Sequence, residues 1–161
     1  QTVTTAESCT AGWLSKQITD VPGSSSWFEF GFVTYANRAK TDLLGVAPET
    51  LETHGADSPQ PRREMAAGAR RWAESAYGLA ISGIAGPTGG TPDKPVGTVD
   101  FALAAPEGVY TRRFDFPNRS RASVRYSSVL TALGLLLWKL DGKLTRHQID
   151  DPRSYESLDL P

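Results

Sequence analysis

Segments of strand composition alternate with segments of helical spacing along most of this chain. The strand-like segments are rich in β-branched and aromatic residues and cover residues 1–6, 28–35, 77–82, 96–105 and 109–116. Apolar residues recur at helical intervals in the other segments, at about residues 13–21, 38–45, 48–51, 62–76 and 121–140. This alternation predicts a single three-layer α/β/α domain.

The order of the segments also predicts the kind of sheet and the place of a ligand site. Only residues 106–108 separate the last two strands, which favours a hairpin and hence a mixed, mainly parallel sheet. Ligands of such sheets bind beyond the carboxyl ends of strands, where loops lead into helices. Three segments follow strands at such positions and are expected to converge on one site: residues 7–10, 34–40 and 82–90.

The length, charge and cysteine content of the chain limit the classes of protein to which it can belong. A chain of 161 residues predicts one domain, which we place at residues 1–140, with residues 141–161 as a polar tail outside the core. The net charge is −1, which gives no field that would attract nucleic acid or a membrane surface. With a single cysteine and no visible signal peptide, the expected location is the cytoplasm.

Ser8 and Cys9 are the candidate nucleophiles, because they lie where the first strand turns into a helix. Free amide groups and the positive end of a helix dipole stabilise an oxyanion at such a turn. The alternative for Ser8 or Thr10 is a helix cap, and for Cys9 a small buried hydrophobic residue. Position alone favours these structural roles.

A serine nucleophile needs a base, and no Ser-His-Asp signature is present. The two histidines, His54 and His147, fall in a polar loop and in the tail. Lys40 is the candidate base because it lies in the first turn of the second predicted helix, of which Asn37 is the expected N-cap. Tyr35 lies just before that turn. The alternatives are a solvated charge for Lys40 and an edge aromatic for Tyr35.

Two features of the sequence are suited to the binding of an anion. The glycine-rich loop at residues 82–90 lets backbone amides approach a ligand, although turn formation is an equal alternative. Arg121 and Arg125 lie four residues apart at the start of the last helix, where arginines suit a phosphate group or form a solvated face. No Cys or His pair has the spacing of metal ligands, so no metal or other cofactor is expected.

Several motifs, in one order over about residues 4–140, resemble the CinA C-terminal domain family. They are TAESCTAG at 5–12, DVPGSS at 20–25, GFVTYAN at 31–37, LGV at 44–46, HGA at 54–56, SGIAGP at 82–87 and KPVGTV at 94–99. This is a family of nicotinamide-nucleotide amidases. The resemblance implies hydrolysis of the carboxamide of nicotinamide mononucleotide (NMN) to nicotinic acid mononucleotide and ammonia.

The resemblance also implies roles for particular residues. Ser8 corresponds to the nucleophile, and Tyr35 and Lys40 correspond to its catalytic partners. The residues expected to bind substrate are Cys9, Ser82, Gly83, Gly86 and Arg121. The family usually has a glycine where Ala11 stands, a change that is tolerable if the backbone there is helical.

The resemblance further implies a homodimer or a higher homo-oligomer. Two alternatives to the amidase remain open. The first is a non-catalytic nicotinamide-nucleotide-binding domain, a sensor or accessory part of a CinA-type protein, which would bind NMN without turnover. The second is an enzyme that accepts a different amide or nucleotide in the same pocket.

Overall fold

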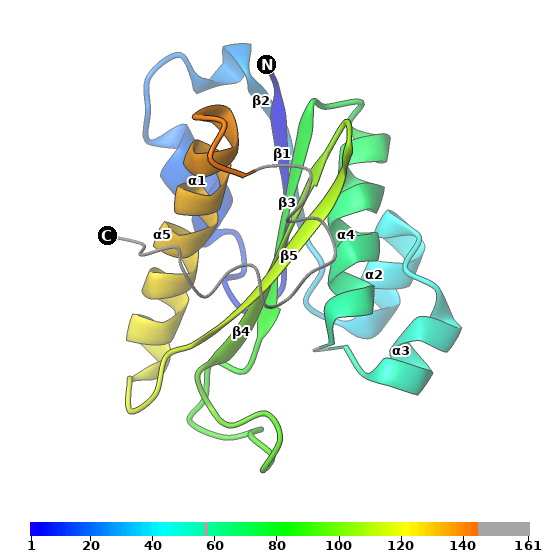
Figure 1. The fold of residues 1–161 in the computed structure, drawn as a ribbon, viewed down its shortest axis with the longest axis vertical. Helices are drawn as coiled ribbons and strands as arrows, with labels where there is room; N and C mark the ends of the chain where they lie inside the picture. Colours follow the sequence, from blue (N-terminus) through cyan, green and yellow to red (C-terminus); the bar gives the residue numbers. More distant parts are fainter. Residues whose placement is uncertain (57, 145–161) are drawn as a thin grey trace.

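A five-stranded sheet forms the centre of the molecule (Figure 1). The computed structural model describes residues 1–56 and 58–144. Its strands are β1 (Val3–Glu7), β2 (Phe28–Val33), β3 (Tyr77–Gly83), β4 (Thr98–Ala105) and β5 (Gly108–Asp115). They lie in the order β2-β1-β3-β4-β5.

The strand directions confirm a mixed, mainly parallel sheet. β1 pairs in parallel with β2 and β3, whereas β4 is antiparallel to both of its neighbours. Every strand except β4 therefore runs in one direction, and β4 and β5 form the expected hairpin. In the register of β3 and β4, Ser82 lies opposite Asp100.

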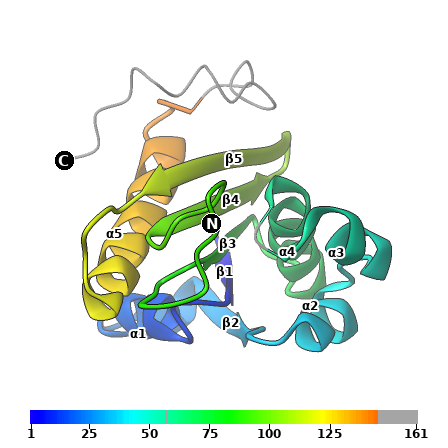
Figure 2. The same ribbon diagram turned by 90° about the horizontal axis from the view of Figure 1, so that it is seen from below.

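Helices cover both faces of the sheet, as the alternating sequence predicts (Figure 2). They are α1 (Trp13–Thr19), α2 (Asn37–Leu44), α3 (Pro48–His54), α4 (Pro59–Trp72) and α5 (Arg121–Leu140), with a 3-10 turn, η1, at Ser24–Ser26. α1 and α5 lie on one face, and α2, α3 and α4 lie on the other. The bounds of α5 are those that the sequence predicts.

Two apolar clusters fill the space between the layers. The larger cluster joins the sheet to α1 and α5 and contains Leu14, Phe101 and Leu135. The smaller cluster, under α4, consists mostly of alanines with Met65, so that the helix lies close to the sheet. Gly68 of α4 lets α2 approach as well, because an added Cβ there would overlap the carbonyl of Leu44. The tight contact between α4 and α2 fixes the position of α2, which carries Lys40.

α4 departs from its predicted bounds at both ends. It begins at Pro59 rather than at Arg62, because proline is compatible with the first turn of a helix. It ends at Trp72 rather than at Ala76. Trp72 is 56% exposed, whereas Met65 and Ala69 of the same helix are buried. Its ring packs edge-on against Phe30 and Phe32 of β2.

Smaller corrections concern α2, α3 and the tail. Ala36, not Asn37, is the N-cap of α2, whereas Gly45 ends the helix with a φ of 69°, as expected. α3 extends to His54, beyond the single turn predicted. Leu144 of the expected tail is buried in the larger core cluster. Residues 145–161, with His147, lie outside the described residues. No helix in the described part of the chain has the length and apolarity of a membrane span.

A polar cluster ties the β4–β5 hairpin to the end of α5. Glu107 in the turn accepts hydrogen bonds from Tyr110 and from Lys139 of α5. Burial alone would raise the pKa of Glu107, but these hydrogen bonds outweigh it and lower that pKa from 4.5 to about 2. The carboxylate therefore stabilises the fold only while it is ionised.

We expect the Glu107 cluster to make stability depend on acid pH. Because the folded-state pKa lies below the unfolded value, the contribution is complete above pH 4.5 and is lost as the pH falls toward about 2. Glu107→Gln is expected to lower the free energy of unfolding by about 1–3 kcal/mol at pH 7. In urea titrations, the difference from wild type should disappear near pH 2. Glu29→Gln, at an exposed position, is the control; a difference that is constant with pH would contradict the account.

Candidate active site

The loops that follow β1, β2 and β3 meet at the carboxyl ends of these strands, at the lower end of the sheet in Figure 1. They enclose a cavity of about 230 Å³. The lining residues are Ser8, Cys9, Tyr35, Asn37, Lys40, Ala56, Gly83, Ala85 and Arg121. The three segments that were expected to converge do so. Arg121 at the start of α5, which was also expected at the site, lines the cavity as well, and the structure adds the α3–α4 loop through Ala56.

Ser8 lies at the cavity directly after β1. Its backbone amide donates a hydrogen bond to the carbonyl of Ile81 in β3, at 3.0 Å. The backbone at Ser8 is thus fixed by the centre of the sheet. α1 begins only at Trp13, and neither Ser8 nor Thr10 caps it. The structural alternative for these two side chains is therefore wrong.

The carboxylate of Glu7, which is fully buried, accepts the hydrogen bonds of the free backbone amides at the amino end of α1. It accepts hydrogen bonds from the amides of Gly12, Leu14 and Ser15, at 3.1, 2.9 and 2.8 Å, and from the Ser15 hydroxyl. An anion at this end of a helix also meets the favourable end of its dipole. Sequence reasoning missed this role, since the capping group lies five to eight residues before its partners.

The turn after Ser8 contains a strained residue. Ala11 has a φ of +50°, in the left-handed region, so the condition under which alanine is well tolerated here, an ordinary helical backbone, is not met. An L-residue costs about 1–2 kcal/mol in that conformation, whereas glycine adopts it freely.

Ala11→Gly is therefore expected to raise the free energy of unfolding by about 0.5–1 kcal/mol, after the greater entropy of unfolded glycine is subtracted. Chemical denaturation measures the change. Ala73→Gly is the control, since Ala73 has a φ of −85° and should lose stability on the same substitution. A loss of stability in both variants would contradict the strain at Ala11.

Lys40 is a buried amine at the cavity, not a solvated surface charge. Its side chain lines the cavity although the residue is only 1% exposed. The Nζ donates a hydrogen bond to the backbone carbonyl of Tyr35, at 3.1 Å. Tyr35, which also lines the cavity, is 60% exposed, and its hydroxyl accepts a hydrogen bond from Arg121 Nη2 at 3.3 Å.

Arg121 connects two sides of the cavity. Besides its contact with Tyr35, its Nη1 donates a hydrogen bond to the carbonyl of Gly86, at 2.8 Å. Gly86 has a φ of +79°, and an added Cβ would overlap Val96, so the loop requires glycine here. The carbonyl of Gly86 thus binds Arg121, but Gly86 itself does not line the cavity. Ser82 is buried within β3 and is also absent from the lining, unlike Gly83.

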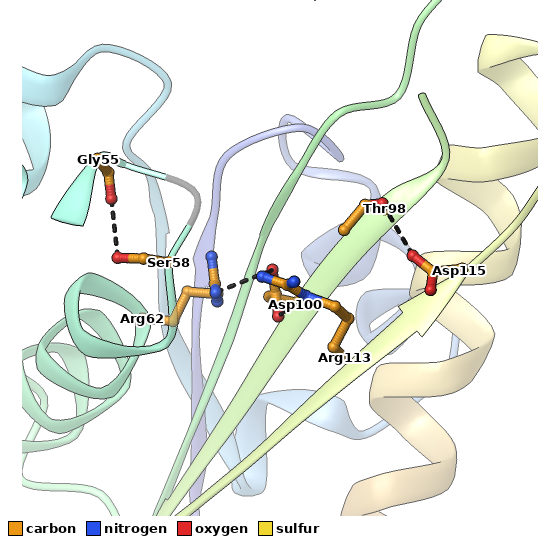
Figure 3. Close-up of polar contacts among 7 residues, drawn as sticks. All are labelled: Gly55, Ser58, Arg62, Thr98, Asp100, Arg113 and Asp115. Atoms are coloured by element: carbon orange, nitrogen blue, oxygen red, sulfur yellow. Dashed lines mark hydrogen bonds and ion pairs between the residues drawn. The ribbon is translucent and has the colours of Figure 1, made fainter. Parts of the chain in front are cut away.

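A buried ion-pair network supports this end of the sheet. The Asp100 carboxylate lies 2.9 Å from Nη2 of Arg62, whose side chain is 0% exposed. Arg113 of β5 donates two hydrogen bonds to the same carboxylate, at 3.0 and 3.1 Å. Figure 3 shows the two guanidinium groups reaching Asp100 from α4 and from β5. The network fixes the start of α4, beside the loop that brings Ala56 to the cavity.

Fold and site define an α/β domain with a polar cavity at the carboxyl ends of its parallel strands. The chain belongs to the CinA C-terminal domain family, whose profile matches residues 1–140. Among solved structures, the competence/damage inducible protein CihA from Agrobacterium tumefaciens is 44% identical, with a TM-score of 0.82 over 84% of this chain and 83% of that one.

Relatives of two lengths are similar to this chain. The nicotinamide-nucleotide amidohydrolase PncC of Escherichia coli K12 is 53% identical over 84% of this chain and 82% of that protein. A CinA-like protein of Desulfosudis oleivorans is 58% identical over 74% of this chain. The match spans only 29% of that relative and 33% of a CinA-like protein of Shewanella pealeana. The chain thus corresponds to most of the E. coli PncC protein and to about a third of these two CinA-like proteins.

Proposed function

We propose that this domain is a nicotinamide-nucleotide amidase that converts NMN to nicotinic acid mononucleotide and ammonia in the cytoplasm. The observation that carries the proposal is the presence of Ser8 and the buried amine of Lys40 on one cavity at the carboxyl edge of the sheet. The name of the PncC relatives, nicotinamide-nucleotide amidohydrolase, agrees with that chemistry, and these relatives match most of this chain.

Ser8 and Lys40 carry the reaction in this proposal. The Ser8 Oγ attacks the carboxamide carbon while its proton passes to the uncharged Lys40 amine. The carbon–nitrogen bond then breaks as the leaving nitrogen takes that proton and departs as ammonia. Water attacks the resulting ester and returns a proton to Ser8 through Lys40. The products are the free acid and the original enzyme, so one water is consumed for each ammonia released.

Arg121 and the glycine loop hold the nucleotide. Two nitrogens of the Arg121 guanidinium contact Gly86 and Tyr35, which holds the group at the rim of the cavity. A guanidinium has five donors in a fixed geometry, so it binds a phosphate while it keeps these contacts. Tyr35 in this scheme orients Arg121 through its hydroxyl and Lys40 through its carbonyl. Cys9 and Gly83 contact the substrate as lining residues, and Ser82 supports the loop from within β3.

The test is ammonia release by the purified protein from NMN, nicotinamide riboside and nicotinamide. We expect turnover of NMN, with a much lower kcat/KM for the two compounds that lack the phosphate. Saturable binding of NMN without turnover, measured by calorimetry, would instead support the alternative of a non-catalytic nucleotide-binding domain. Turnover of another amide in preference to NMN would replace the proposed substrate. We also propose a homo-oligomer, which light scattering of the same sample tests.

A further inference from the structure

Arg125 of α5 contacts the backbone that follows Ser8, although it lies more than a hundred residues further along the chain. Its Nε donates a hydrogen bond to the carbonyl of Cys9 at 3.0 Å. Its Nη2 donates another to the carbonyl of Thr10 at 2.9 Å. Two donors of one rigid guanidinium thus hold two successive peptide groups. Arg125 is not among the residues that line the cavity.

Other contacts hold this guanidinium and this turn in place. The Arg125 guanidinium lies 5.4 Å from the centroid of the Trp13 ring, at the start of α1. On the other side of the turn, Glu7 binds the first amides of α1. Between the two lies Ala11 in its unfavourable left-handed conformation. A strained turn keeps its geometry only where its surroundings determine it.

The hydrogen bonds of Arg125 fix the direction of a particular amide. A peptide group is planar and trans, so its N–H points away from its carbonyl oxygen. Because the Cys9 carbonyl faces Arg125, the N–H of Thr10 points to the opposite side. The preceding peptide is fixed as well, since the carbonyl of Ser8 accepts a hydrogen bond from the Ala11 amide at 3.1 Å. The two amides that follow Ser8 therefore have determined directions.

We infer that Arg125 is a positioning residue, which holds the Cys9–Thr10 peptide so that its N–H stabilises the oxyanion formed when Ser8 attacks the substrate. This role rests on the proposed amidase activity. Donors of an oxyanion hole act through fixed orientation, and loss of one such donor costs about 10²–10³ in kcat. Arg125 provides that orientation from outside the cavity, without contact to the substrate.

The first experiment replaces Arg125 by methionine, which keeps much of the side-chain volume and removes its donors. We expect kcat for NMN to fall about 10- to 100-fold, with KM changed by less than about threefold, because ground-state binding is retained. Arg119→Met is the matched control: Arg119 precedes the same helix, but its guanidinium donates to Ser127 at 2.6 Å. It should leave both constants near their wild-type values.

Two further measurements separate positioning from general damage to the fold. Guanidinium ion added to Arg125→Ala should restore part of kcat, whereas added ammonium should not. Hydrogen–deuterium exchange should become faster in the peptide that covers residues 7–14 and remain unchanged in β3 and β4. Arg125→Lys, which keeps the charge but has no forked pair of donors, is expected to show intermediate kcat and exchange. This variant also keeps the test available if Arg125→Met does not fold.

The outcomes distinguish the inference from the proposed function. If wild type turns over NMN and Arg125→Met keeps its kcat, the positioning role is wrong and the amidase stands. If wild type has no amidase activity, the proposed function is wrong and the exchange data decide whether Arg125 holds the turn. Unchanged exchange at residues 7–14 in the variants would overturn the inference in either case.

Discussion

Replacing Ser8 by alanine is expected to lower kcat for ammonia release from NMN by about 10⁴-fold or more. The Ser8 Oγ forms the covalent bond in the proposed reaction, and no other side chain takes its place once it is removed. The KM or the dissociation constant for NMN should change little, because the contacts of Arg121 and the glycine loop remain. Steady-state ammonia release and calorimetric binding of NMN measure the two effects separately.

Cys9→Ala is the matched control for this prediction. Cys9 lies next to Ser8, lines the same cavity and is 5% exposed. If Cys9 contributes only volume, its replacement should reduce kcat by less than about tenfold. Loss of activity in Cys9→Ala together with retained activity in Ser8→Ala would assign the nucleophile to the thiol and contradict our account.

The largest effect on stability is expected for Asp100→Ala. The substitution leaves the guanidinium of Arg62, whose side chain is 0% exposed, without the carboxylate that lies 2.9 Å away. Removing one partner of a buried ion pair typically costs about 3–5 kcal/mol, because the remaining charge stays in a poorly solvated place. Urea denaturation should therefore show a large decrease of the midpoint.

Two comparisons test the cause of that loss. Asp115→Ala, on the same hairpin, removes a carboxylate that accepts a single hydrogen bond from Thr98 (Figure 3). It should cost only about 1 kcal/mol. The double variant Arg62→Met, Asp100→Leu should be more stable than Asp100→Ala, since it leaves no buried charge at these two positions. A double variant less stable than the single one would contradict the explanation.

The layers and the sheet follow from the sequence because local patterns determine them. The twenty residues of α5 keep helical spacing throughout, and its predicted bounds agree with the structure. Residues at the ends of elements are less predictable. Asn37 suits an N-cap by its residue type, yet the backbone places it inside α2. Arg62 is fully buried because Asp100, from a strand far along the chain, pairs with it.

The site was predictable as a set of loops but not as a set of contacts. Parallel strands bring their carboxyl ends to one edge, so the meeting of Ser8, Lys40 and Gly83 follows from topology. The contacts of Arg121 and Arg125 depend on how α5 docks beside the loops. No local pattern indicates that one arginine binds Gly86 and the other the carbonyls after Ser8. The left-handed Ala11 is likewise a result of tertiary structure.

Partition of the reaction by hydroxylamine is the most direct test of the central claim, that the carboxamide of NMN is hydrolysed through an ester of its acyl group on Ser8. Hydroxylamine attacks such an ester in competition with water. With wild-type protein and NMN, we predict that the hydroxamate of the nucleotide replaces the free acid as hydroxylamine increases, while one ammonia is released for each product. Ser8→Ala should form neither product. Formation of the free acid alone, at every hydroxylamine concentration, would contradict an acyl-enzyme on Ser8.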